Sequence, residues 1–367
     1  MNKRTVLLIL FVLIFFTLIL SLVSSTHRPS LELFSDLLKL QTFSHSTTPN
    51  DQDNLSEKPS DREDEFVYPT YTDHLLNTSN FHYSGACRQI FRYKQSTSRD
   101  LWLTAFSFDT TQKWLSIKSQ AERAFSIAKS GIPNASKHVL LLTPPNDDFM
   151  NTMKLFNVSV DVVDYGLEKT NGAVMRFFAA RNWITEHRKE YDRIIFSDFK
   201  DVFIFADAFK TFSNDDFVVL MECWAFNNTD SCWKLDDKTN RRWITDTFGE
   251  AVGDAYANNK TLLSNAGIVF GGTEKVLKYF EIVTHNMKRE KYGLWGHDQA
   301  VHNYVLNTLQ LDSLNLTKDY CTQRVCFGEA WSTIWDPQTG AIFTKETGCS
   351  PVIRHKIWFD NYKHYYG

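Results

Sequence analysis

Two aspartates, Asp198 and Asp201, come directly after an apolar segment in the run Ile-Ile-Phe-Ser-Asp-Phe-Lys-Asp-Val of residues 194–202. Such an apolar run is typical of a short buried strand. Ligands of open α/β sheets bind just beyond the carboxyl ends of strands, where paired carboxylates can hold a divalent cation and its phosphates. The alternative is a structural role, in which Asp201 caps a following helix or pairs with Lys200 or Arg193.

A polar side chain and a glycine open a second apolar segment, Ser-Asn-Ala-Gly-Ile-Val-Phe-Gly-Gly at residues 264–272. Asn265 can donate to a sugar hydroxyl, and Gly267 allows a ligand or a neighbouring backbone to approach closely. The alternative for this segment is a tight turn between a strand and a helix.

Two later segments carry further candidates. Residues 295–304 read Trp-Gly-His-Asp-Gln-Ala-Val-His-Asn-Tyr and place Asp298 near the start of a helix, where a carboxylate is usually only a cap. If that start faces a cleft, Asp298 can act as an acceptor base or stabilise positive charge on a sugar ring. In Ser-Pro-Val-Ile-Arg-His, residues 350–355, His355 is a candidate metal ligand as a neutral imidazole, although a lone histidine is more often structural.

In this order, the four segments resemble the metal-dependent glycosyltransferases of the nucleotide-diphospho-sugar transferase (GT-A) fold. The signature of that family is an apolar strand ending in an acidic motif, a downstream Asn-Ala/Ser-Gly segment, an Asp-Gln-x-x-x-Asn helix and a late apolar-x-His. The resemblance covers residues 102–355, and the order of the parts is more diagnostic than any one of them.

The resemblance implies a metal site. Asp198 and Asp201 would hold Mn²⁺ or Mg²⁺ against the donor diphosphate, and His355 would be the third protein ligand. Arg354, beside that histidine, is unusual in an apolar strand and would neutralise the leaving diphosphate.

The resemblance also implies a donor site and a reacting centre. Asn265 and Gly267 would border the donor sugar, and Asp298 and Gln299 would lie at the reacting carbon. Arg176 matches a basic position that precedes the acidic strand in similar proteins and would contact the donor. Its alternative role is that of a solvated charge on a helix.

The chain departs from the family after the acidic motif. Similar sequences often continue as Arg-Asp-Val-x-Phe-Gln-x-Asp-Pro-Phe, whereas residues 200–209 read Lys-Asp-Val-Phe-Ile-Phe-Ala-Asp-Ala-Phe. The metal ligand Asp201 is kept, together with Val202, Asp207 and Phe209. The departures leave the identity of the donor open.

The activity that the resemblance implies is transfer of a sugar from a nucleotide-diphosphate sugar, most commonly a UDP-sugar, to a glycan, glycoprotein or glycolipid. The cation would act as a Lewis acid at the diphosphate. One alternative is a catalytically inactive luminal protein of GT-A fold that binds glycans, and another is a hydrolase. The retention of Asp198, Asp201 and His355 favours the transferase over the glycan-binding protein, and the family resemblance favours it over the hydrolase, which would use the same carboxylates.

These residues need an α/β framework. Periodicity predicts strands at 101–106, 139–143, 158–164, 194–196, 217–221 and 262–270, and helices at 115–130, 172–188, 273–287 and 298–306. This alternation predicts an α/β domain over 81–367, with a GT-A-like (Rossmann-like), mainly parallel sheet flanked by helices and the site at its carboxyl edge.

An uncharged apolar run near the amino terminus predicts a membrane anchor. Residues 6–23 contain no charge and span roughly 27 Å as a helix, after a cytosolic tail at 1–5 that carries Lys3 and Arg4. Residues 24–80 read as a flexible luminal stem. We therefore expect a single-pass type II protein of the Golgi or ER membrane with a luminal catalytic domain. The alternative is a cleaved signal peptide and secretion.

Composition agrees with the secretory pathway. The six cysteines fit disulfides, with Cys223–Cys232 and Cys321–Cys326 attractive by spacing and Cys87–Cys349 left over, although fifteen pairings are possible and a zinc site is the alternative. Glycosylation acceptors occur at Asn54, Asn77, Asn134, Asn157, Asn227, Asn259 and Asn315. A net charge of −3 supplies no general attraction for nucleic acid.

Overall fold

The computed structural model describes residues 76–164, 170–328 and 332–356, all of which belong to the unit Asp64–Gly367. The predicted tail at 1–5, the predicted anchor at 6–23 and almost all of the predicted stem lie outside the described residues. Among the residues that are described, no helix is both long enough and apolar enough to cross a membrane.

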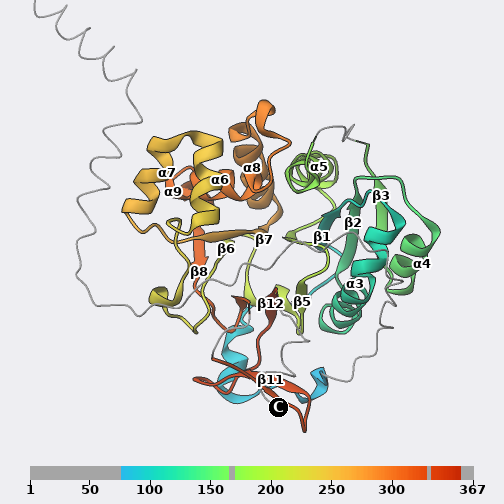
Figure 1. Ribbon diagram of the computed structural model, residues 1–367. Helices are drawn as coiled ribbons and strands as arrows, with labels where there is room; N and C mark the ends of the chain where they lie inside the picture. Colours follow the sequence, from blue (N-terminus) through green and yellow to red (C-terminus); the bar gives the residue numbers. More distant parts are fainter. Residues whose placement is uncertain (1–75, 165–169, 329–331, 357–367) are drawn as a thin grey trace, which may run out of the picture. The chain divides into compact units, whose positions relative to one another are not determined.

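The centre of the fold is a sheet of seven strands in the order β3-β2-β1-β4-β7-β6-β8 (Figure 1). The strands are β1 (Asp100–Phe106), β2 (Ser136–Leu141), β3 (Ser159–Val162), β4 (Arg193–Ser197), β6 (Phe217–Met221), β7 (Ser264–Gly272) and β8 (Leu316–Asp319). Only β7 runs against its neighbours, β4 and β6; the other pairs are parallel. The predicted α/β class with a mainly parallel sheet is confirmed.

Helices cover both faces of this sheet. They are α3 (Thr111–Gly131), α4 (Asp147–Leu155), α5 (Gly172–His187), α6 (Lys238–Phe248), α7 (Glu250–Asn258), α8 (Thr273–Asn286) and α9 (His297–Asn307). Alternate residues of β1 divide between two cores, because successive side chains of a strand point to opposite faces. Leu101 and Leu103 pack with residues of α5, α8 and α9, whereas Trp102 packs with residues of α3 and α4.

Two small sheets and several short 3₁₀ helices complete the described part of the chain. In one sheet, β12 (Ile353–His355) lies between β5 (Val202–Ile204) and β9 (Val325–Phe327), and the other pairs β10 (Thr333–Asp336) with β11 (Ala341–Thr344). The 3₁₀ helices are η1 (Thr78–Asn80), η2 (Gly85–Ile90), η3 (Ala208–Thr211), η4 (Thr229–Ser231), η5 (Arg289–Lys291) and η6 (Asp312–Leu314). Every strand and helix predicted above is present, with ends displaced by a few residues. The short strands, α4, α6 and α7 were not predicted.

The predicted disulfides are present. Cys223 pairs with Cys232, Cys321 with Cys326, and Cys87 with Cys349 across 262 positions of the chain. All six cysteines of the chain are therefore oxidised in pairs, and the alternative of a cysteine-bound zinc ion is wrong.

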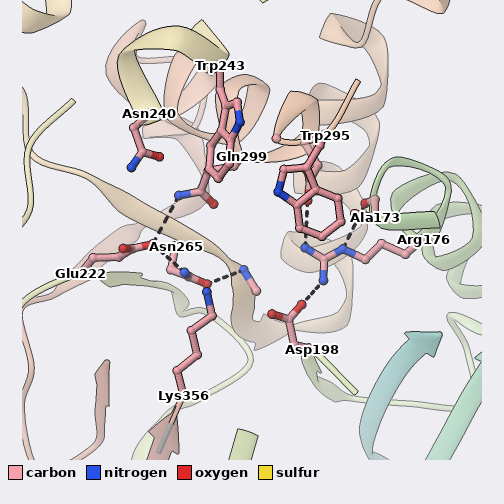
Figure 2. A pocket seen from close by; sticks show the side chains of 13 residues that line it. Ala173, Arg176, Asp198, Glu222, Asn240, Trp243, Asn265, Trp295, Gln299 and Lys356 are labelled. Carbon is pink, nitrogen blue, oxygen red and sulfur yellow. Dashed lines mark hydrogen bonds and ion pairs between the residues drawn. The ribbon is translucent and has the colours of Figure 1, made fainter. Parts of the chain in front are cut away.

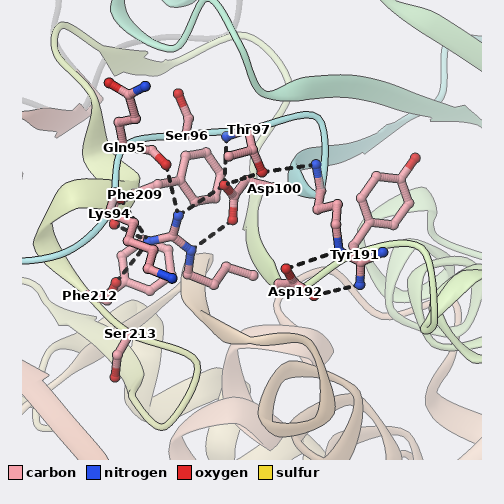
Figure 3. Close-up of polar contacts among 12 residues, drawn as sticks. Lys94, Gln95, Ser96, Thr97, Asp100, Tyr191, Asp192, Phe209, Phe212 and Ser213 are labelled. Atoms are coloured by element: carbon pink, nitrogen blue, oxygen red, sulfur yellow. Dashed lines mark hydrogen bonds and ion pairs between the residues drawn. The ribbon is translucent and has the colours of Figure 1, made fainter.

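Arg193, the first residue of β4, holds the sheet to the segment that follows β5. Its buried guanidinium forms two bonds with Asp100 of β1, at 2.7 and 2.9 Å, and donates to the backbone carbonyls of Phe209 and Phe212. Figure 3 labels these three partners. A buried charge with this many partners is fully compensated. Arg193 is thus engaged elsewhere and does not pair with Asp201, so that structural alternative for the second aspartate is wrong.

Candidate metal and substrate site

The candidate site begins where β4 ends. Asp198 follows Ser197, the last residue of that strand, whose hydroxyl accepts a hydrogen bond of 2.8 Å from the buried indole of Trp102. The backbone N–H of Asp198 donates to the carbonyl of Gly267 in β7, at 2.6 Å. Because β7 is antiparallel to β4, its first residues meet the last residues of β4 at the carboxyl edge of the sheet.

Asp198, Asp201 and His355 form a group that can hold a metal ion. Each offers one ligand atom, and these atoms lie within 4.8 Å of one another. Nε2 of His355 is 3.2 Å from Oδ2 of Asp198 and 3.8 Å from Oδ1 of Asp201. That buried Oδ1 accepts no hydrogen bond from any described residue, so a ligand atom is available. Two carboxylates and one imidazole can together bind a divalent cation.

Strand pairing brings His355 to the aspartates. His355 lies opposite Val202 in the pair β5–β12, and the N–H of Lys356 donates to the carbonyl of Asp201 at 2.7 Å. Burial lowers the pKa of His355 to about 3, although Asp201 opposes this shift. The imidazole is therefore neutral at physiological pH, which is the form that binds metals.

Arg176 of α5 connects the metal group with α9. Its Nη1 pairs with Oδ1 of Asp198, and its Nη2 lies 3.0 Å from Oδ2 of Asp298, in the first turn of α9. Its Nε donates to the carbonyl of Ala173 at 3.1 Å. The side chain is largely buried, so Arg176 is not a solvated helix charge.

Amide side chains shape the start of β7. Asn265 accepts a bond of 2.7 Å from the N–H of Gly267 and donates one of 2.6 Å to Glu222. Gln299 accepts from the N–H of Ala266 at 2.8 Å and donates to the carbonyl of Ser264 at 2.8 Å. The backbone bonds occupy much of the hydrogen-bonding capacity of Gln299, so its amide positions the strand.

These residues surround a cavity of about 240 Å³. Six of the predicted site residues line it, namely Arg176, Asp198, Asn265, Gly267, Asp298 and Gln299. His355 and Asp201 lie next to it through their contacts with Asp198. The structure thus brings together eight of the nine residues predicted from the sequence.

Arg354 is the exception. Adjacent residues of a strand face opposite sides, and Arg354 lies between Ile353 and His355 in β12. Its buried guanidinium donates to the hydroxyl of Thr333 in β10. Arg354 does not line the cavity, so the structure does not bring it to the diphosphate position that the resemblance implied.

Sequence reasoning missed seven residues that line the cavity, namely Ala173, Glu222, Asn240, Trp243, Trp295, Gly296 and Lys356, and Figure 2 labels six of them, all but Gly296. Glu222 follows β6 directly, and the rule that sites lie beyond the carboxyl ends of strands would have indicated it. Asn240 and Trp243 belong to α6, which was not predicted as a helix.

Comparison with known proteins adds no assignment, because no protein-family model and no curated protein matches this chain. The chemistry of the site therefore has to be argued from its own geometry. One end of the cavity carries the Arg176–Asp198–Asp298 ion pairs next to the candidate metal ligands. The other carries a carboxylate, amides and indoles.

Proposed function

We propose that this protein is a metal-dependent glycosyltransferase that moves a sugar from a nucleotide-diphosphate sugar to a glycan, glycoprotein or glycolipid acceptor. The observation that carries the proposal is the group of Asp198, Asp201 and His355 beside the cavity, in which a buried carboxylate oxygen has no partner among the described residues. Its place at the carboxyl edge of a mainly parallel sheet is the usual place for nucleotide ligands in such folds.

In this function, Asp198, Asp201 and His355 would hold Mn²⁺ or Mg²⁺. The bound cation supplies Lewis-acid charge that offsets the negative charge on the departing nucleotide diphosphate. Arg176, already paired with Asp198, adds a fixed positive charge that lines the same cavity. A fixed cation in a partly buried site interacts with a diphosphate more strongly than one in bulk water.

The reacting sugar would lie against the start of β7. Asn265 and Gly267 both line the cavity at this point, and a side chain at Gly267 would meet Asp198, His355 and Asn265. Asp298 lines the cavity from the first turn of α9, and its proposed role is acceptor base or stabiliser of positive charge on the sugar. A UDP-sugar is the donor that the family resemblance favours.

The proposed location is the Golgi or ER membrane, with residues 6–23 as anchor and the catalytic domain in the lumen. Three disulfides support an oxidising compartment. Several asparagines of glycosylation motifs are exposed in the structure, namely Asn77, Asn134, Asn157, Asn227 and Asn315.

Thermal unfolding of the full chain in detergent tests this function. We expect one nucleotide diphosphate to raise Tm with Mn²⁺ present and to lose that effect with a chelator, because a ligand at about 100 times its Kd adds about 2.7 kcal/mol. Asp198→Asn and Asp201→Asn should abolish the response and still fold.

The matched control is Asp215→Asn, an exposed aspartate outside the site, which should respond like the wild type. An unchanged response in both site variants would exclude the assignment. Absence of any response to a full panel of nucleotide diphosphates and nucleotide sugars would favour the alternative, an inactive protein of GT-A fold that binds glycans.

A further inference from the structure

The part of the cavity away from the metal ligands has its own chemistry (Figure 2). Its walls come from two elements: Glu222 follows β6, and Asn240 and Trp243 lie in α6. Figure 2 draws Trp295, which precedes α9, beside Arg176, so this indole borders the part from the ion-paired end. A carboxylate, an amide and two indoles offer hydrogen bonds together with flat apolar surfaces. This combination differs from the ion-paired end at Arg176 and is not explained by a role in binding a metal diphosphate.

Glu222 is the hydrogen-bond acceptor in this part of the cavity. Its Oε1 takes hydrogen bonds from Asn265 at 2.6 Å and from Gln299 at 3.4 Å, whereas its Oε2 accepts none from the described residues. Asp198 and Asp298 form ion pairs with Arg176, but Glu222 forms none within the described part of the chain. Burial raises the pKa of Glu222, and Lys356 opposes this shift. The carboxylate is thus held in place by neutral donors with one oxygen available.

Two tryptophans line the cavity. Trp295 is 69% exposed, although it borders a polar cavity. Gly296, at φ 81°, is pressed against Trp243, because a Cβ there would lie 2.1 Å from that indole. The buried Nε1 of Trp243 has no hydrogen-bond partner among the described residues. An indole offers an apolar face and a polar N–H at once, and such groups usually find a partner when buried.

The size of the cavity limits what it encloses. At about 240 Å³, it is smaller than the roughly 300–1,000 Å³ of sites that enclose a drug-sized ligand. The cavity therefore does not enclose a whole nucleotide sugar together with a whole acceptor.

We infer that this part of the cavity binds a sugar ring of the acceptor, with an indole against the C–H face of the ring and Oε2 of Glu222 accepting a hydrogen bond from a hydroxyl. A sugar ring presents C–H groups on its faces and hydroxyls at its rim, which matches the indoles and the polar side chains of Glu222 and Asn240. The assignment of this ring to the acceptor rests on the proposed function.

Saturation-transfer NMR on the full chain, in a detergent without a sugar headgroup, tests the inference. The probes are methyl glycosides of neutral hexoses and pentoses, each with and without UDP and Mn²⁺. We expect at least one of these glycosides to bind. Trp295→Ala and Glu222→Gln should each weaken binding of the neutral glycoside by about tenfold or more.

The matched control is Trp233→Ala, which removes another exposed tryptophan (46% exposed) that does not line the cavity, and it should bind like the wild type. Because Trp295 is exposed, its removal leaves the fold intact. Binding of no glycoside under either condition, or equal affinity in wild type and Trp295→Ala, would overturn the inference.

The outcome also separates this inference from the proposed function. Asp198→Asn should lose the response to nucleotide and keep glycoside binding. If the wild type binds a neutral glycoside but shows no metal-dependent response to any nucleotide, the transferase proposal fails and the sugar subsite stands. If it responds to nucleotide and binds no glycoside, the subsite fails and the transferase proposal stands.

Discussion

Gly267 lies where three side chains of the site converge. A Cβ at this position would lie 2.4 Å from Oδ2 of Asp198, 2.6 Å from Cε1 of His355 and 2.7 Å from Oδ1 of Asn265. Each of these side chains is held by other contacts, so none can move away freely. The glycine is required by space and not by backbone conformation.

We therefore expect Gly267→Ala to weaken Mn²⁺ binding by about tenfold or more and to lower the free energy of unfolding by about 1–3 kcal/mol, the usual cost of overpacking. Isothermal titration with Mn²⁺ and denaturant unfolding measure the two effects. The matched control is Gly253→Ala in α7, whose new methyl group would first meet the side chain of Thr245. Equal Mn²⁺ affinity in the Gly267 variant and the wild type would contradict the assignment of the ligands.

At the scale of elements, the site depends on how α9 holds the first residues of β7. Asn303 accepts from the N–H of Ser264 at 2.9 Å and donates to the carbonyl of the same residue at 2.9 Å. His302 lies between the hydroxyls of Tyr279 and Ser264, at 2.8 Å from each. These bonds keep the start of β7 at the edge of the sheet, and with it Asn265 and Gly267.

The buried histidine makes this arrangement sensitive to acid. Burial lowers the pKa of His302 from its ordinary value of 6.5 to about 3. The folded protein therefore keeps it neutral where the unfolded chain binds a proton. Its contribution to stability is complete above about pH 6.5 and is lost as the pH falls towards about 3.

We expect the free energy of unfolding to fall by about 2 kcal/mol between about pH 6.5 and pH 5 on account of His302. Denaturant unfolding at a series of pH values measures the slope. His302→Gln should reduce the slope, because glutamine does not titrate, and the exposed His285→Gln is the matched control. An identical slope in the His302 variant and the wild type would show that His302 does not cause the loss of stability at low pH.

At the scale of the whole molecule, the first described residues hold the segment that leads to β12. Cys87 is bonded to Cys349, the backbone N–H of His82 donates to the hydroxyl of Ser350 at 2.8 Å, and Tyr83 donates to the carbonyl of Pro351 at 2.7 Å. These contacts join parts of the chain that are more than 260 positions apart. The position of His355 thus depends on residues near the start of the domain.

We expect the double variant Cys87→Ser, Cys349→Ser to lower the free energy of unfolding by roughly 2–5 kcal/mol, because this disulfide closes a very long loop, and to weaken Mn²⁺ binding through β12. Thermal unfolding and Mn²⁺ titration measure the two effects. Cys223→Ser, Cys232→Ser is the control, since that bridge spans only 9 positions and should cost less stability. Loss of stability with unchanged Mn²⁺ affinity would show that β12 is held without the disulfide.

The sequence by itself determined the main elements of the central sheet and the place of Asp198 after β4, and it indicated the disulfide pairs among the fifteen that six cysteines allow. Each has a local cause: long segments with a clear hydrophobic period identify their own structure, an acidic residue at the end of an apolar run marks a strand end, and two of the three disulfides close short loops. The third pair then followed from the two cysteines left over.

Only the tertiary structure decided which side chains meet. His355 reaches Asp201 because β12 pairs with β5, and strands of three residues are too short to show a period. The same pairing turns Arg354 away from the cavity. Glu222 and Trp243 lie on separate elements and line one cavity only in the folded protein. Convergence of this kind is set by long-range pairing and packing, which no local pattern of residues records.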